Sequence, residues 1–338
     1  MNLSNTLNLI GWLGYEKLID VFHAFEIDTG IHVNFRGFRN QDDMLEAAQK
    51  LAADVASPTT DRLASWIDSD LIQAWSEPDI NIDGLDSNYL ANHLTVVDGK
   101  RMGSPCLWGS AGLGFDKRKL SLAYGQASLI DIFDDRYAGR VTLRADTAFV
   151  AAGRALDAQG RLPYSFDESY IDESKMIANY DIILDFLLSK KKNVAQFWFS
   201  EKEGQDAFSQ GGCVIGYSWD SSIRGLQRNN LPIGYLAPTE GAVCYLQNLV
   251  LLKGAKNTAQ AHTWVAWINS PKNGAMWANA FGVNSTAKGA IDQLDGEARR
   301  FFEAAYPDDA LERLWWQPSQ PSWFSNRRMA YAKTFEAA

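Results

Sequence analysis

The sequence has few of the residues that build metal centres and disulfide frameworks. Its 338 residues include three cysteines and four histidines. Cys106, Cys213 and Cys244 form no close pair, and each lies in an apolar, strand-like run. We therefore expect small buried residues and no fully paired disulfide set. The histidines are scattered without the spacing of a ligand set, so we expect no metal and no cofactor.

Basic charge and long apolar runs are also lacking. The net charge of −9 and the pI near 5.0 argue against a nucleic-acid-binding protein, which usually carries a basic face. No apolar stretch approaches the length of a membrane span. Met1 is followed by a polar segment, with no basic start and apolar run of a leader peptide. This start indicates either a cytoplasmic protein or a mature form whose leader has been removed.

Signatures of catalysis are missing as well. The sequence contains no H-E-x-x-H, no P-loop and no C-x-x-C. The run Gly109-Ser110-Ala111-Gly112 lacks the spacing of a nucleophile elbow, and Gly112-Leu113-Gly114 lacks the third glycine of a dinucleotide fingerprint. Because two-lobed α/β proteins include transferases and deaminases, an enzyme acting on a small amine stays open as the alternative to a binding protein.

Helix-like and strand-like runs alternate along the chain. With 46% apolar and 22% charged residues, the chain is globular and long enough for two lobes. The strand-like runs are Thr6–Ile10, His32–Phe38, Asp54–Ala56, Leu107–Phe115, Val141–Leu143, Cys213–Tyr217, Ile233–Leu236 and Leu246–Leu252. The helix-like runs are Glu16–Glu26, Asp42–Leu51, Ser128–Phe133, Thr147–Asp157, Lys175–Ser189, Ala259–Trp267 and Ala275–Ala280. This alternation predicts an α/β protein with mainly parallel strands.

Aromatic residues gather where strands should end. Trp12 and Tyr15 follow the first strand-like run, and Trp219 closes the run that begins at Cys213. Ligands of open α/β sheets bind beyond the carboxyl ends of the strands, where flat rings can hold an apolar stem or a cation. Packing beneath the next loop is the other interpretation of these rings. For Trp264 and Trp267, which share one helix, core packing is the better interpretation.

The helix after the first strand has its apolar residues on one predicted face. These residues are Leu18, Ile19, Phe22 and Phe25.

Several short motifs occur in one order along nearly the whole chain. They are Asn5-Thr6-Leu7 with Trp12 and Tyr15, Phe25 with Thr29-Gly30-Ile31-His32-Val33, Pro105-Cys106-Leu107-Trp108-Gly109, Tyr137-Ala138-Gly139-Arg140-Val141, Val214-Ile215-Gly216-Tyr217-Ser218-Trp219, and Glu240-Gly241 before Leu246–Leu252. Each is weak alone, but the ordered set resembles the periplasmic solute-binding proteins of polyamine ABC transporters, the spermidine/putrescine-binding type.

The resemblance implies a two-lobed periplasmic-binding-protein type II fold with two hinge-crossing strands. The lobes would be residues 1–108 plus 246–291 and residues 109–245 plus 292–338. It also implies a periplasmic, monomeric solute-binding protein that closes on its ligand by a hinge and delivers it to the membrane permease of an ABC importer.

The resemblance further implies a set of ligand-binding residues. Aromatic positions of the family fall on Trp12, Tyr15, Trp219 and Tyr245; polar positions fall on Thr59 and Gln317, and an acidic one falls on Asp146.

Three positions depart from the pattern. Phe149 and Gln247 stand where polyamine binders carry carboxylates, and Val283 stands where they carry a late aromatic residue. A buried ammonium needs a paired charge or hydrogen bonds, and these positions lack the expected carboxylates. Polyamines stay the first ligands to test, and a smaller or zwitterionic amine is the second candidate class.

Four charged residues are additional candidates. Asp61 and Asp220 can accept from an amine, and Gln247 can fix a polar end of the ligand. Arg62 and Arg144 can bind a carboxylate or a phosphonate with two parallel hydrogen bonds. A solvated rim or a salt bridge between the two lobes is the alternative for all four charges.

Overall fold

The computed structural model describes residues 5–14, 18–90 and 95–338, and the chain divides into two compact units. Unit 1 comprises Met1–Trp108 and Tyr245–Arg299, and unit 2 comprises Gly109–Cys244 and Arg300–Ala338. The chain passes from one unit to the other within strand β7 (Ser104–Asp116), strand β12 (Val243–Leu252) and helix α11 (Gly296–Ala305). The predicted lobes placed the last change near residue 291, one short segment before α11.

The sheet of unit 1 has a parallel part and an antiparallel part. Strand β1 (Thr6–Trp12) lies parallel to β2 (His32–Phe38) and to β3 (Val55–Ala56). Strand β12 runs antiparallel to β3 and to β4 (Ile72–Gln73). The expectation of mainly parallel strands is therefore wrong. Strand β12, which returns the chain from unit 2 to unit 1, runs antiparallel to both of these neighbours.

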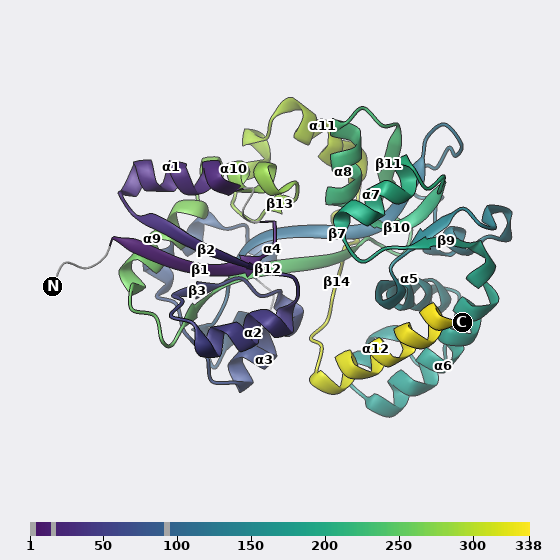
Figure 1. The fold of residues 1–338 in the computed structure, drawn as a ribbon, viewed down its shortest axis with the longest axis horizontal. Helices are drawn as coiled ribbons and strands as arrows, with labels where there is room; N and C mark the ends of the chain where they lie inside the picture. The colour runs from purple at the N-terminus through teal and green to yellow at the C-terminus, as the bar shows by residue number, and fades with distance from the viewer. Residues whose placement is uncertain (1–4, 15–17, 91–94) are drawn as a thin grey trace. The chain divides into compact units, whose positions relative to one another are not determined.

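Helices cover both faces of this sheet, as the alternation of β1 requires. Leu7 and Leu9 pack into a cluster with α1 (Ile19–Thr29), α9 (Thr258–Ile268) and α10 (Pro271–Phe281), and Ile10 packs into a second cluster with α2 (Gln41–Lys50) and α3 (Leu63–Asp68). Figure 1 shows α1 and α10 on one side of β1 and β2, with α2 and α3 on the other.

The buried face of α1 differs from the predicted one at two positions, Ile19 and Val21. Leu18, Val21, Phe22 and Phe25 are buried, whereas Ile19 is 66% exposed. Ile19 is the first residue of the helix, and its side chain faces solvent.

Asp54 ties the start of β3 to two other segments of unit 1. Its carboxylate accepts from the backbone N–H groups of Asn8, Lys256 and Asn257 and from the amides of Asn8 and Asn257, all at 2.9–3.0 Å. The side chain is 1% exposed, so these five hydrogen bonds replace its hydration.

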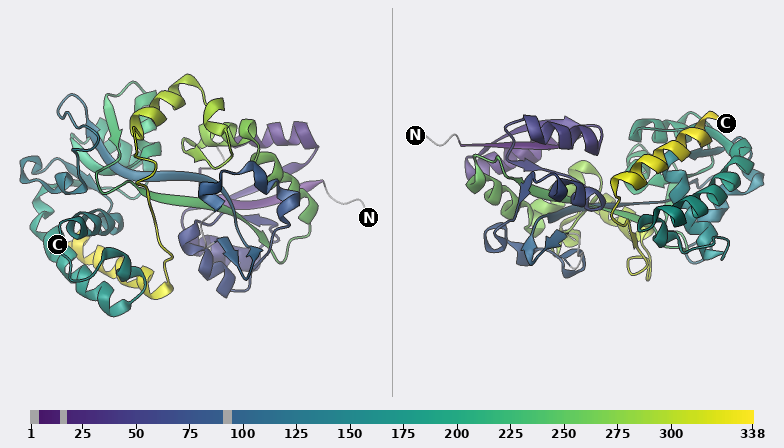
Figure 2. Two further views of the ribbon diagram at one scale, coloured as in Figure 1. Left: turned by 180° about the vertical axis from the view of Figure 1, so that it is seen from behind. Right: turned by 90° about the horizontal axis from the view of Figure 1, so that it is seen from below.

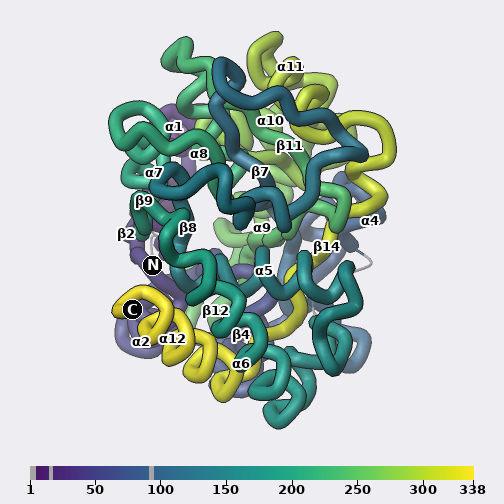
Figure 3. The backbone as a smooth tube through the Cα atoms, turned by 90° about the vertical axis from the view of Figure 1, so that its right-hand side faces the viewer, coloured from purple at the N-terminus to yellow at the C-terminus, as the bar shows by residue number. Residues whose placement is uncertain are grey.

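The sheet of unit 2 has a parallel centre. Strand β8 (Val141–Leu143) lies parallel to β9 (Val194–Phe197) and to β10 (Ile215–Trp219), while β7 runs antiparallel to β10 and to β11 (Ile233–Leu236). Figure 3 shows α7 (Glu201–Ser209) and α8 (Asp220–Arg228) on one side of β8 and β9, with α5 (Ala145–Ala158), α6 (Glu173–Ser189) and α12 (Ser322–Ala337) on the other.

The main core of unit 2 is aromatic. Phe149 of α5 stacks on Tyr180 of α6 at 5.3 Å between ring centroids, and Tyr170 stacks on Phe324 of α12 at 4.2 Å. The last helix thus packs alongside α5 and α6, as Figure 2 shows. Lys191 donates from Nζ to the carbonyls of Phe335 and Glu336 at 2.5 and 2.8 Å, and these hydrogen bonds satisfy carbonyls at the C-terminal end of this helix.

The remaining elements are short. They are the helix α4 (Ser87–Leu90), the strands β5 (Val96–Val97), β6 (Lys100–Arg101), β13 (Asn284–Ser285) and β14 (Trp315–Trp316), and the 3-10 turns Thr60–Arg62, Glu77–Ile80, Ile82–Gly84, Leu129–Phe133, Asp135–Tyr137, Phe166–Tyr170, Lys191–Asn193 and Ala290–Gln293. The predicted helix over Ser128–Phe133 is one of these 3-10 turns.

Small and aromatic residues assigned to the core are found there. Cys106, Cys213 and Cys244 are all buried and free, and Trp264 is fully buried in the core of unit 1. Burial raises the pKa of the Cys213 thiol to about 11. Gly241 has φ +84°, and a Cβ there would lie 1.9 Å from the carbonyl oxygen of Arg313, so this turn admits only glycine.

Candidate functional site

Three parallel strands of unit 2 end at one edge of the sheet, with an arginine or a tryptophan at the end of each. Arg144 follows β8, Trp198 follows β9, and Trp219 is the last residue of β10. The two indoles meet edge to face with ring centroids 4.8 Å apart. This is the edge at which open α/β sheets bind ligands.

The guanidinium of Arg144 lies over both indoles. Its central carbon is 5.6 Å from the ring centroid of Trp219 and 5.9 Å from that of Trp198. Its Nε donates to Oδ1 of Asp146, in the first turn of α5, at 2.7 Å. Arg144, Asp146 and the two tryptophans, here called the strand-end cluster, therefore combine both signs of charge with flat apolar rings.

Asp220 directly follows Trp219 but faces inward. It is 1% exposed, and its oxygens accept from the backbone N–H of Ser221 and from the hydroxyl of Tyr306, each at 2.7 Å. Burial raises the pKa of this carboxyl to about 6, against the lowering effect of the Tyr306 hydrogen bond. The structure thus gives Asp220 internal partners within unit 2.

A chain of buried hydroxyls leads to this carboxylate. Ser110 Oγ lies 2.5 Å from the hydroxyl of Tyr235 and 2.6 Å from that of Tyr306. An ionised carboxylate only accepts, so Tyr306 donates to Asp220, Ser110 donates to Tyr306, and Tyr235 donates to Ser110. Each hydroxyl has one proton, and the ionised state of Asp220 therefore sets the direction of the whole chain.

In unit 1, Trp12 ends β1 as predicted. Its ring is half-buried against both core clusters of the unit, and its indole Nε1 is buried without a hydrogen-bond partner among the residues that the structure describes. A buried indole N–H normally finds an acceptor, so this group can donate to a bound molecule. Tyr15 lies outside the described residues.

Thr59 and Gln247 are brought together in unit 1. They form an isolated antiparallel bridge, and Gln41 donates from Nε2 to Oγ1 of Thr59 at 2.8 Å. Gln247 is 4% exposed, and Tyr245, two residues earlier on β12, is half-buried on the same face of that strand.

The other charged candidates of unit 1 are engaged with protein groups. Arg62 donates to the carboxylate of Asp42, and Asp61 in the same 3-10 turn is half-buried with a partner of its own. Val283 is 2% exposed and belongs to the core of unit 1.

Gln317 and Phe149 belong to unit 2. The backbone N–H of Gln317 donates to the carbonyl of Cys244 at 3.0 Å, which places its half-buried side chain beside the end of β14. Phe149 is fully buried, so its side chain is part of the core of unit 2.

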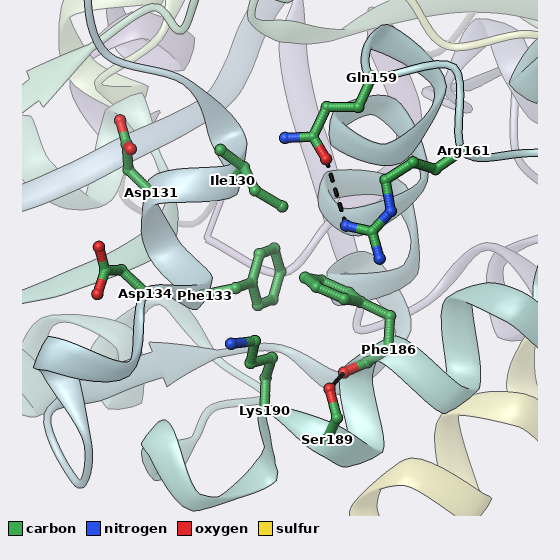
Figure 4. Close-up of a pocket in the computed structure, with 9 residues that line it drawn as sticks. All are labelled: Ile130, Asp131, Phe133, Asp134, Gln159, Arg161, Phe186, Ser189 and Lys190. Carbon is green, nitrogen blue, oxygen red and sulfur yellow. Dashed lines mark hydrogen bonds between the residues drawn. The ribbon is translucent and has the colours of Figure 1, made fainter.

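A separate hollow of about 430 Å³ lies in unit 2 at the opposite end of α5. Figure 4 shows Phe133 and Phe186 at its floor and Arg161 beside Phe186, whose ring centroid is 5.4 Å from the guanidinium carbon. Asp146 lies in the first turn of α5 and Gln159 is its C-cap, so at 1.5 Å per residue about 20 Å of helix separates this hollow from the strand-end cluster.

Within the described ranges, no group of three or more His, Cys, Asp or Glu side chains is arranged to hold a metal ion. The described helices include none with the length and apolar character of a membrane span.

Trp198 is the member of the strand-end cluster that the sequence-based candidates lack, and at 2% exposed it is a buried support for Trp219 and Arg144. The sequence does contain a pattern that points to Trp198. Val194–Phe197 is a short apolar run that ends directly before it, just as β1 and β10 end at tryptophans. The run carries Gln196 and only four residues, which weakens its strand pattern.

Comparison with known proteins yields one family and several relatives. Residues 20–303 match the family model described as bacterial extracellular solute-binding protein. The putrescine-binding periplasmic protein SpuD of Pseudomonas aeruginosa is 25% identical over 342 residues, covering 94% of this chain and 88% of that protein.

Solved structures share the fold. The spermidine/putrescine ABC transporter substrate-binding protein PotD of Streptococcus pneumoniae has a TM-score of 0.79 at 19% identity, with 98% of each chain covered. The periplasmic binding protein AgtB of A. tumefaciens R10, solved with agropinic acid, has a TM-score of 0.70 at 16% identity, with 98% of each chain covered. These likenesses confirm the predicted two-lobed solute-binding fold, and the matches give no support to the enzyme alternative.

Proposed function

Because this chain belongs to the bacterial extracellular solute-binding protein family, we propose that it captures a small amine-containing solute for an ABC importer. The putrescine-binding relative from P. aeruginosa, whose match spans nearly the whole chain, supports an amine as part of the ligand. That relative is a periplasmic protein, which also supports a periplasmic location for this chain. The solute would then pass to a membrane permease, with the binding protein acting as a monomer.

The observation that carries this proposal is the strand-end cluster of unit 2. Trp219 offers the face of a half-buried ring and Asp146 offers a carboxylate, and both lie at the carboxyl ends of parallel strands, whereas Trp198 is 2% exposed and supports Trp219 from below. A ring face attracts a cation through its quadrupole, and a carboxylate pairs with an ammonium group. Such a set can bind an amine through its ring face and its carboxylate.

The remaining candidates complete the proposed site. Trp12 and Tyr245 would stack on the ligand, and Thr59, Gln247 and Gln317 would bond its polar atoms. Asp61 and Tyr15 belong to the same proposed set. Asp220, with its carboxylate turned inward, would act by holding Trp219 in place.

We place the hinge of the proposed mechanism in β7 and β12, where the chain changes unit. A ligand that contacts residues of both units would favour a closed arrangement over an open one, since a ligand shifts a conformational equilibrium by its differential affinity.

Calorimetry against amines, amino acids, opines and phosphonates tests the proposal. We expect at least one small molecule of this panel to bind with one-to-one stoichiometry and to be recovered unchanged. Small-angle scattering should show a smaller radius of gyration with that ligand. No binding across the panel together with no compaction, or turnover of the ligand, would reject the proposal.

A further inference from the structure

The hydrogen-bonding capacity of Arg144 is only partly used. Its Nε donates to Asp146, but no described residue accepts a hydrogen bond from either terminal nitrogen, Nη1 or Nη2. The side chain is 31% exposed, and its guanidinium lies over the indoles of Trp198 and Trp219 and is held by the hydrogen bond to Asp146. This leaves two parallel N–H donors at the edge of a held, planar group.

Asp146 is in the same situation with the opposite charge. Its Oδ1 accepts from Arg144, and no donor for Oδ2 is found in the described parts of the chain. The side chain is 12% exposed, so a charged group that reaches it does so with little competing water. One cation and one anion thus stand side by side, each with unused hydrogen-bonding atoms.

The charge balance of the cluster decides between classes of ligand. Arg144 and Asp146 cancel, so the strand-end cluster carries no net charge. The next carboxylate along the chain, Asp220, is 1% exposed with both oxygens bonded inside unit 2, so it adds no acceptor for a ligand. A dication would meet one available carboxylate and one repelling guanidinium, whereas a molecule with one charge of each sign would pair with both.

We infer that the solute is a zwitterion of the amino-acid type, whose carboxylate binds the Nη1 and Nη2 atoms of Arg144 while its ammonium pairs with Asp146. This inference rests on the proposed function and narrows its amine to one that retains an acidic group. The paired N–H donors of a guanidinium match the two oxygens of a carboxylate in spacing and direction. The half-buried indole of Trp219 then covers the aliphatic part next to the charged groups.

Matched ligand pairs test the inference. Each amino acid is compared by calorimetry with the amine that has lost its carboxylate: ornithine with putrescine, lysine with cadaverine, and arginine with agmatine. We expect the amino acid of at least one pair to bind roughly 10- to 100-fold more tightly than its amine, the value of a charge-assisted pair of hydrogen bonds. If the amine binds as tightly as its amino acid in every pair that binds, the inference is overturned and the proposed function stands. Failure of every amino acid and every amine counts against the proposed function itself.

Variants identify the residue responsible. Arg144→Gln should abolish the preference for the amino acid over its amine, and Arg144→Lys should restore it only in part, because lysine keeps the charge and loses the paired donors. Arg161→Gln is the matched control, since Arg161 also stacks on an aromatic ring but lies at the other end of α5. It should leave the preference unchanged.

The preference ratio separates ligand binding from a structural role of the Arg144–Asp146 pair. If Arg144→Gln lowers the thermal midpoint and leaves the ratio of amino-acid to amine affinity intact, the pair only stabilises the start of α5 and the inference is wrong. Asp146→Asn should weaken the amino acid more than its N-acetylated derivative, which lacks the ammonium.

Discussion

Replacing Asp220 by asparagine should change how the stability of the protein depends on pH. The carboxyl has a pKa of about 6 in the folded chain, chiefly because of burial, against an ordinary value of 3.8. At about 1.4 kcal/mol per pKa unit, the folded state loses about 3 kcal/mol relative to the unfolded state when this group ionises.

The sign follows from proton binding. Between the two pKa values the folded chain holds a proton that the unfolded chain has released. The stabilisation that this proton gives to the folded state is therefore fully present below pH 3.8 and is lost as the pH rises through about 6. The asparagine variant has no such group. The free energy of unfolding of the wild type minus that of Asp220→Asn should therefore fall by about 2 kcal/mol between pH 4 and pH 7.

Urea denaturation followed by tryptophan fluorescence and far-ultraviolet circular dichroism measures this difference. The altered hydrogen bonds to Ser221 and Tyr306 add a constant offset, which leaves the slope unaffected. Tyr306→Phe should have the opposite effect to Asp220→Asn. It removes a hydrogen bond that lowers the pKa of Asp220, so the contribution of Asp220 to the free energy of unfolding should fall by more between pH 4 and pH 7 than it does in the wild type. If the difference in the free energy of unfolding between wild type and Asp220→Asn is the same at pH 4 and pH 7, the reasoning is refuted.

Four further predictions concern binding, packing and reactivity. Trp12→Ala should weaken ligand binding by about 1–3 kcal/mol in calorimetry if the ring stacks on the ligand, and unchanged affinity would return it to a packing role. Asp54→Ala should lower the free energy of unfolding by at least about 3 kcal/mol, because it leaves five donors without their acceptor, and a loss below about 1 kcal/mol would contradict this. Gly241→Ala should lower the melting temperature by several degrees, since its Cβ would overlap the Arg313 carbonyl, and an unchanged midpoint would argue against the turn. Cys213 should react with a thiol reagent at pH 8 only as fast as the protein unfolds, because its thiol is buried with a pKa of about 11, and rapid native labelling would disprove it.

The periodic segments were predictable because burial imposes their pattern. His32–Phe38 and Val141–Leu143 match β2 and β8 to the residue. The predicted Asp54–Ala56 begins one residue before β3, because the polar Asp54 is held by side-chain and backbone donors that no periodicity reveals. The directions of β7 and β12 were missed for a related reason, since a buried run reads the same whether its partner strand is parallel or antiparallel.

The candidate site was predictable where a ring stands at the end of a strand. Trp12 and Trp219 do end β1 and β10, as the rule for open sheets indicates. Partnership between charges was not predictable: Arg144 and Asp146 are two residues apart, and only the turn from β8 into α5 brings their side chains together. The inward turn of Asp220 depends on Tyr306, which lies 86 positions away in sequence and is invisible to local reasoning.

The three changes of unit along the chain bear on how the protein is synthesised. Unit 1 lacks β12, α9 and α10 until residues up to 299 have left the ribosome, and unit 2 lacks α12, with the buried rings of Phe324 and Phe335, until its final segment follows. A nascent chain therefore carries two unfinished cores for most of translation. That delay leaves time for chaperones to engage the apolar strands before either core can close around them.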